Sequence, residues 1–310
     1  MASRASEADQ GTDTYFGREL GDQKTMSPSV IRGIFDVFSL TSILVLLVLG
    51  MAIIVGMMKV FNMCQGELVL LGAGTAYLSY QYFGSVLIGI FLAPILVGLF
   101  GLVLERTVIH RFYANPQGAL LATFAIGLVI RESLQTRMAA QSSLVPAPIG
   151  SSINIGGALL PVWRIVIMVV TLIVAISIGL ILMKTSVGLK IRATLDNPEL
   201  VASSGISTKW MYAWTYALGA ALAGFAGAMI VPLQTLYPNL GYDNLIPMFI
   251  AVMVGGLGQF SGPIAGAALI AIPGGILSQF INPVSSQILV LIFAIIFMRF
   301  RPMGIFQRGR

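Results

Sequence analysis

The sequence predicts an all-α, polytopic transmembrane helical bundle of about eight spans plus one broken or re-entrant segment. Its 310 residues are 57% hydrophobic and only 10% charged, and the mean hydropathy is +0.91. Soluble domains carry about 25% charged residues, so this chain has too few to cover a surface that faces water. The apolar residues also come in long runs, each near the ~20 residues that a helix needs to cross the hydrocarbon core.

The elements follow from these runs. Residues 1–32 are rich in Ser, Thr, Asp and Gly and have little to bury, which predicts a disordered cytoplasmic tail. Residues 33–306 form the transmembrane domain. Its spans are expected at about 34–58, 84–104, 118–136, 161–183, 209–231, 243–257, 262–281 and 285–300. A further apolar stretch, 62–82, is interrupted by glycines, so it is expected to be broken or re-entrant.

Clusters of basic residues orient the bundle, because loops that remain in the cytoplasm are enriched in Lys and Arg. Three clusters are predicted to be cytoplasmic, Arg106 to Arg111, Lys184 to Lys209 and Arg299 to Arg310. With the tail also inside, they fall on one side only if 62–82 enters and leaves on the same side, or is a broken helix packed inside the protein. The predicted topology is therefore N-in and C-in, with eight crossings.

The composition excludes several classes of function. A lone Cys64 and a lone His110 rule out an internal disulfide and a cysteine or multi-histidine metal site, so no metal is expected. The net charge of +6 lies mainly in short connections and forms no basic face interleaved with aromatic residues, so no nucleic acid is expected as a partner. No G-x-x-x-x-G-K-[ST] motif is present, so ATP with Mg²⁺ would belong to a separate chain. An enzyme is not expected.

The connection Thr185–Ser207 carries the clearest local signals. Asn197 is a good N-cap, Pro198 suits the first helical position and Glu199 suits the positive end of the helix dipole. Gly205 can adopt the left-handed conformation that ends a helix. The pattern predicts a short helix capped at both ends, whose shape serves docking; an ordinary surface loop is the alternative.

Several motifs resemble those of the permease subunits of branched-chain amino-acid and urea ABC importers, over about residues 33–306. Residues Asn62–Glu67 are similar to the family's N-x-A-H-G-E signature. The segment 185–207 resembles the family's coupling segment, through Gly188, Arg192, Asp196, Asn197, Pro198, Glu199, Ala202 and Gly205. The patches Ala220–Gly227, Gly255–Gly258 and Phe300–Gly304 follow in the expected order.

The resemblance implies a multi-pass importer subunit of the bacterial inner membrane. Its implied partners are a second homologous permease subunit, two ATP-binding cassette ATPases that dock on the coupling segment, and an external solute-binding protein. The implied solutes are branched-chain amino acids, or equally urea and short-chain amides. One departure matters: Cys64 and Gln65 stand where the signature has Ala and His, so any proton-linked role of that histidine does not carry over.

Transporter sites favour short or Gly/Pro-interrupted segments at matching places in two halves. Two segments fit, and they provide the candidate pathway residues: Asn62, Gln65, Gly66, Glu67, Gly72 and Gly74 in the first, and Pro247, Gly255, Gly256 and Gly258 in the second. Tight helix packing is the alternative for the glycines. For Glu67 the alternative is a structural carboxylate at a helix start.

The alternative function is a secondary transporter or channel that works alone on a small neutral solute. It predicts an ion-coupling pair of charged residues within the spans, where only Glu67 offers itself. It also leaves the capped connection unexplained.

Overall fold

The computed structural model describes residues 28–58, 62–113, 115–138, 143–256, 261–301 and 304–305. The predicted tail therefore lies outside the described residues, except for 28–32, which already belong to the first helix. Gly258 also lies outside them.

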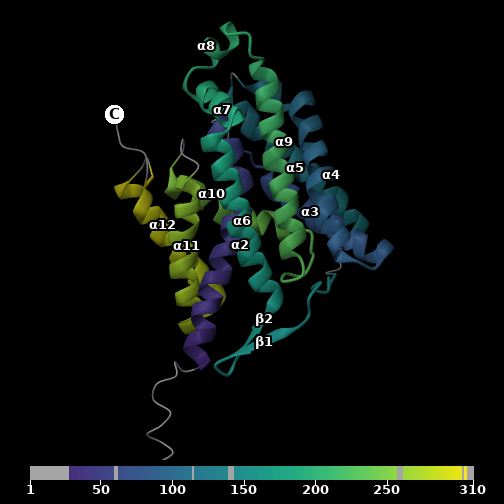
Figure 1. Ribbon diagram of the computed structural model, residues 1–310, viewed down its shortest axis with the longest axis vertical. Helices are drawn as coiled ribbons and strands as arrows, with labels where there is room; N and C mark the ends of the chain where they lie inside the picture. Colours follow the sequence, from purple (N-terminus) through teal and green to yellow (C-terminus); the bar gives the residue numbers. More distant parts are fainter. Residues whose placement is uncertain are drawn as a thin grey trace, which may run out of the picture.

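The described chain is almost entirely helical (Figure 1). Its elements are α2 (Pro28–Met58), α3 (Gln65–Phe83), α4 (Val86–Thr107), the 3-10 helix η1 (Ile109–Phe112), α5 (Pro116–Met138), β1 (Ser152–Ile155), β2 (Ala158–Pro161), α6 (Val162–Lys184), α7 (Ser186–Asp196), α8 (Pro198–Ser203), α9 (Thr208–Ile230), α10 (Leu240–Gly255), α11 (Ser261–Phe280) and α12 (Pro283–Phe300). Strands β1 and β2 form an antiparallel hairpin in which Ser152 pairs with Pro161.

The predicted spans are confirmed as helices. Among the described residues, α2, α4, α5, α6, α9, α11 and α12 are long and apolar enough to cross a membrane, and α10 is a shorter apolar helix. The polytopic helical bundle is thus the fold of this chain.

The segment 62–82 differs from its prediction. Helix α3 is continuous over 19 residues, about 28 Å at 1.5 Å per residue, so its length suffices for a crossing. The break comes before it, in the turn at residues 62–64. Gly72 interrupts nothing: a Cβ there would overlap the backbone of Gly224, so this glycine lets α3 and α9 approach closely.

The bundle has two distinct ends (Figure 1). One carries α7 and α8 and is called the α8 end; the other carries the β1–β2 hairpin and is called the hairpin end. Helix α2 begins at the hairpin end, where Pro28 lies against Gly157, whereas α12 finishes towards the α8 end. For the described residues, the prediction that the chain enters and leaves the bundle on the same side is therefore wrong. Because the prediction assumed a cytoplasmic tail, it required that the segment of α3 not cross the membrane.

The described residues of the basic clusters nevertheless lie towards one end, as predicted, since α12 with Arg299 finishes towards the α8 end. The Arg106 guanidinium at the end of α4 lies 3.5 Å from the ring centre of Trp210, which follows α8 in the chain. Because α3 crosses and the chain enters α2 from the hairpin end, this arrangement needs no re-entrant segment.

The core lies where α2, α3, α4 and α9 meet, and it depends on small residues. A Cβ on Gly227 of α9 would overlap the carbonyl oxygen of Val69 in α3, and one on Gly101 of α4 would overlap Ala220. Helix α9 is therefore mostly buried, whereas α5, the least hydrophobic of the seven long candidate spans, is mostly exposed.

Candidate functional site

The turn before α3 brings together the polar residues of the predicted signature. The Asn62 Oδ1 accepts a hydrogen bond from the Cys64 backbone N–H at 3.1 Å, and its Nδ2 donates to the Gln65 Oε1 at 3.2 Å. Asn bonding the backbone two residues later is a common way to form such a turn. The side chains of Asn62, Gln65 and Glu67 are all at least 95% buried. We call residues 62–67 the α3 junction.

Helices α3 and α10 meet at this junction through their first turns. Gly66 and Gly241 face each other so closely that a Cβ on either would overlap the carbonyl oxygen of the other. The Glu67 carboxylate lies beside this contact, and its Cγ lies against Gly127 of α5. The starts of the two segments that supplied the candidate pathway residues, one from Asn62 and one before Pro247, are thus brought into contact.

The α3 junction holds buried polar atoms without partners. Neither the Gln65 Nε2 nor the Glu67 Oε2 has a hydrogen-bond partner among the described residues. Polar groups buried in a membrane protein cost free energy unless something satisfies them, so this is where a polar solute or water would be stabilised.

The other predicted pathway residues lie elsewhere. Gly72 packs on α9, and a Cβ on Gly74 would meet nothing within 4 Å. Pro247 lines a separate cavity of about 730 Å³ between α2, α10, α11 and α12. Gly255 packs against Gly262 and Gly256 against Gly304 at the far end of α10, so these glycines serve helix packing.

At the α8 end, the predicted capped helix is confirmed. The Asn197 Oδ1 accepts a hydrogen bond from the Leu200 N–H at 3.1 Å, and Pro198 is the first helical residue. Gly205 has φ +82°, the left-handed conformation expected of a stop. The helix projects from the bundle: Glu199 and Ala202 are exposed, and the Leu200 side chain is 63% exposed.

Helix α7 was missed by the sequence analysis. The Thr185 Oγ1 accepts a hydrogen bond from the Gly188 N–H at 3.2 Å and caps its start, a signal that was available in the sequence. A Cβ on Gly188 would overlap the carbonyl oxygen of Leu182, so this glycine permits the tight corner from α6. The Arg192 Nη2 donates to the Met183 carbonyl at 3.3 Å and satisfies the end of α6. Asp196 is the last residue of α7.

An aromatic cluster joins the ends of α4 and α9 close to α8. Besides the contact of Arg106 with Trp210, the Tyr113 hydroxyl donates to the Glu105 carboxylate, and its ring centre lies 5.0 Å from that of Tyr212. Burial raises the pKa of Tyr113, and so does this hydrogen bond, so the hydroxyl remains protonated and a donor. The sequence analysis used Arg106 only for orientation.

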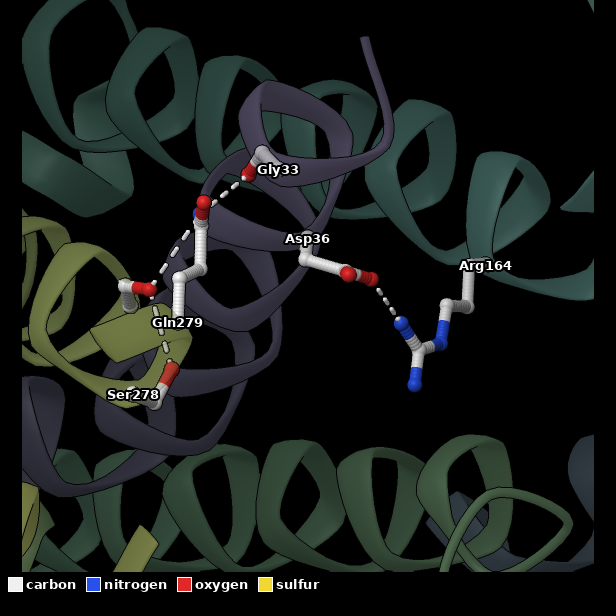
Figure 2. A network of polar contacts seen from close by, with 6 residues as sticks. Gly33, Asp36, Arg164, Ser278 and Gln279 are labelled. Atoms are coloured by element: carbon white, nitrogen blue, oxygen red, sulfur yellow. Dashed lines mark hydrogen bonds and ion pairs between the residues drawn. The ribbon is translucent and has the colours of Figure 1, made fainter. Parts of the chain in front are cut away.

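A polar network at the hairpin end was also missed. Figure 2 shows Arg164 of α6 paired with Asp36 of α2 at 2.5 Å, and Gln279 of α11 donating to the Gly33 carbonyl at 3.0 Å. The two charged side chains are about one-third exposed and lie near the starts of their helices. The pair therefore ties α2 to α6 at the rim, and it lies far from the α3 junction.

No site for a metal emerges from the described residues, since no group of three or more His, Cys, Asp and Glu side chains could hold an ion.

A bundle of helices that are long and apolar enough to cross a membrane defines a polytopic membrane protein. The chain belongs to the family described as "Branched-chain amino acid transport system / permease component", which matches residues 33–298.

Its curated relatives carry matching names. It is 27% identical to the probable branched-chain amino acid transport permease protein LivH of Methanocaldococcus jannaschii, over 82% of this chain and 81% of the relative. It is 21% identical to BraD of Pseudomonas aeruginosa, a high-affinity branched-chain amino acid transport system permease protein, over 85% of this chain and 91% of the relative. The corresponding LivH of Escherichia coli is also 21% identical, over 90% and 96%. No solved structure matches this chain.

Proposed function

We propose that this chain is the permease subunit of an ATP-binding cassette importer that moves a branched-chain amino acid into the bacterial cytoplasm. The observation that carries the proposal is the exposed, doubly capped helix α8 at the end of the bundle where the basic clusters lie. Basic loops remain in the cytoplasm, so α8 faces the compartment that holds ATP. The start of α2 is then external. Membership of the permease family and the names of the relatives support the same assignment.

The energy is supplied by two separate ATPase subunits, which bind Mg-ATP and dock on α7 and α8. A second permease subunit completes the pathway, and an external binding protein delivers the solute. Two exposed polar side chains towards the end of α5, Glu132 and Gln135, support such a partner, because they are poorly suited to lipid.

The helix packing supports a route by which a push on α8 would reach the pathway. Only residues 204–207 separate α8 from α9, and α9 is held tightly against α3 through Gly227 and Gly224. Helix α3 begins at the junction, where Gly66 meets Gly241 of α10. A displacement of α8 would therefore be transmitted along rigid helices to the buried polar groups of the α3 junction.

The test is uptake of radiolabelled leucine by proteoliposomes that contain the permease with its ATPase and binding-protein partners. The proposal expects uptake that requires ATP and each partner. Uptake by the permease alone would identify the stand-alone transporter instead. ATP-driven uptake of urea without uptake of leucine would assign the chain to the urea and amide branch.

A further inference from the structure

Two oppositely charged side chains lie at the same corner of α3, α5 and α10 without bonding to each other. Glu67 touches Gly127 of α5 and Gly241 of α10. Arg131 lies one turn after Gly127, and its guanidinium lies 5.2 Å from the ring centre of Tyr242, the neighbour of Gly241. Their contacts with the adjacent residues Gly241 and Tyr242 place the two groups at one corner.

Each of these charges lacks a direct partner. The Oε2 of Glu67, a side chain 95% buried, accepts no hydrogen bond among the described residues. Arg131 is half-buried and forms no ion pair in the part of the chain that the structure describes, and its guanidinium lies over the face of Tyr242. A carboxylate and a guanidinium in spanning helices are costly unless a partner of opposite charge satisfies each of them.

An apolar groove runs past the sequence neighbours of these two residues, although neither Glu67 nor Arg131 itself lines it. It has a volume of about 650 Å³ and lies between α3, α4 and α5. Leu71, one turn after Glu67, lines it on α3, and Ile126 and Ile130, the neighbours of Gly127 and Arg131, line it on α5. Val97 and Phe100 of α4 complete the wall.

We propose that this corner is a recognition site for a zwitterionic amino acid with an aliphatic side chain. The Glu67 carboxylate accepts hydrogen bonds from the ammonium group, the Arg131 guanidinium donates to the carboxylate, and the side chain lies in the groove. Urea carries no charge to match either group and no apolar part to fill the groove. The inference rests on the proposed function and assigns residues of this chain to its substrate site.

The first test compares permease variants in proteoliposomes with the ATPase and binding-protein partners present. Replacing Arg131→Gln should lower leucine uptake about tenfold or more, the scale of losing one charged hydrogen bond. ATP hydrolysis stimulated by the binding protein should persist, because the coupling segment is untouched. Arg131→Lys should restore part of the uptake. The matched control is the same substitution outside the proposed site, Arg164→Gln in the part-exposed pair with Asp36, which should behave as wild type.

The second test measures ligand binding at the proposed site in the permease alone, without ATPase or binding protein. In an Ile130→Cys variant, millimolar leucine should slow modification of the new thiol by N-ethylmaleimide; Cys64 is fully buried and stays unmodified. Leucinamide, which lacks the carboxylate, and urea should give no protection. Adding Arg131→Gln should abolish the protection by leucine.

The outcomes separate the two claims. If the wild-type complex imports no leucine with ATP, the proposed function is wrong. If wild type imports leucine but Arg131→Gln imports it equally well, or urea protects Ile130→Cys as leucine does, the recognition site is wrong and the permease assignment stands.

Discussion

The α3 junction and helix α8 were both predicted as functional from sequence, and they differ most in burial. At the junction, Asn62, Gln65 and Glu67 are almost completely enclosed, and Gly66 and Gly241 bring α3 and α10 to within backbone contact. At α8, the side chains of Glu199 and Leu200 project from the bundle. The junction therefore depends on interior packing and polar partners, whereas α8 depends on its own capped shape and on what docks there.

The largest effect is expected where the packing beneath the junction is closest. Gly227→Leu should abolish folding, because even its Cβ would overlap the Val69 carbonyl and overpacking a rigid core costs about 1–3 kcal/mol or more. The yield of monodisperse protein in detergent measures this. Gly74→Ala is the control: its Cβ meets nothing within 4 Å, and it should be neutral or stabilising by up to about 1 kcal/mol.

Substitutions of the polar residues at the α3 junction should reduce transport more than they reduce stability. Glu67→Gln removes a charge that costs roughly 2.5–3.5 kcal/mol in a membrane, so the variant should fold and assemble normally. Its ATP-driven uptake of leucine should nevertheless fall by about tenfold, because a charged partner is lost. An unchanged transport rate would leave Glu67 a structural carboxylate.

Substitutions at α8 should uncouple ATP hydrolysis from transport without unfolding the protein. Gly205→Val forces a β-branched residue into φ +82°, at a cost of about 1–2 kcal/mol that falls on an exposed turn. Glu199→Lys places a positive charge at the positive end of the helix dipole. Both variants should reach the membrane intact, with ATP hydrolysis no longer producing uptake. If both transport like wild type, α8 is an ordinary loop.

A smaller effect is expected in the aromatic cluster that joins α4 to α9. Trp210→Leu removes the face on which Arg106 lies, a contact worth about 0.5–1 kcal/mol at an exposed site. The melting temperature should fall slightly. Uptake per folded molecule should also fall, because the cluster transmits motion from α8. Unchanged uptake per folded molecule would assign the cluster to stability alone.

The smallest effect is expected at the hairpin end. Asp36→Asn breaks the pair with Arg164, but both side chains are about one-third exposed, and such pairs contribute no more than about 1 kcal/mol. Uptake should be unchanged. A loss of transport comparable to that of Glu67→Gln would indicate that this pair has an ion-coupling role, as the stand-alone transporter requires.

Much of the fold was predictable because hydropathy and capping are local properties. The long spans, the N-cap at Asn197 and the stop at Gly205 follow from residue types and their order. The fold differed from prediction where the chain's own pattern was ambiguous. Gly72 looks in sequence like a helix breaker, and only the approach of α9 shows that it is a contact point.

The site was predictable only in part. The residues of the α3 junction share one short motif, so sequence located them together. Gly241 and Arg131 come from distant helices, and nothing local in the sequence places them beside Glu67. The N-cap of α7 by Thr185 is a local signal that was predictable from the sequence. The hydrogen bond from Arg192 to the end of α6 was not, because it depends on the angle between α6 and α7.

The central claim is that α8 is the surface on which a separate ATPase acts, and cross-linking tests it most directly. In the assembled complex, a cysteine introduced at the exposed Ala202 should form a cross-link to the ATPase subunit, and one at the exposed Asn154 of the hairpin should not. An ATPase cross-linked at Asn154 but not at Ala202 would contradict the account.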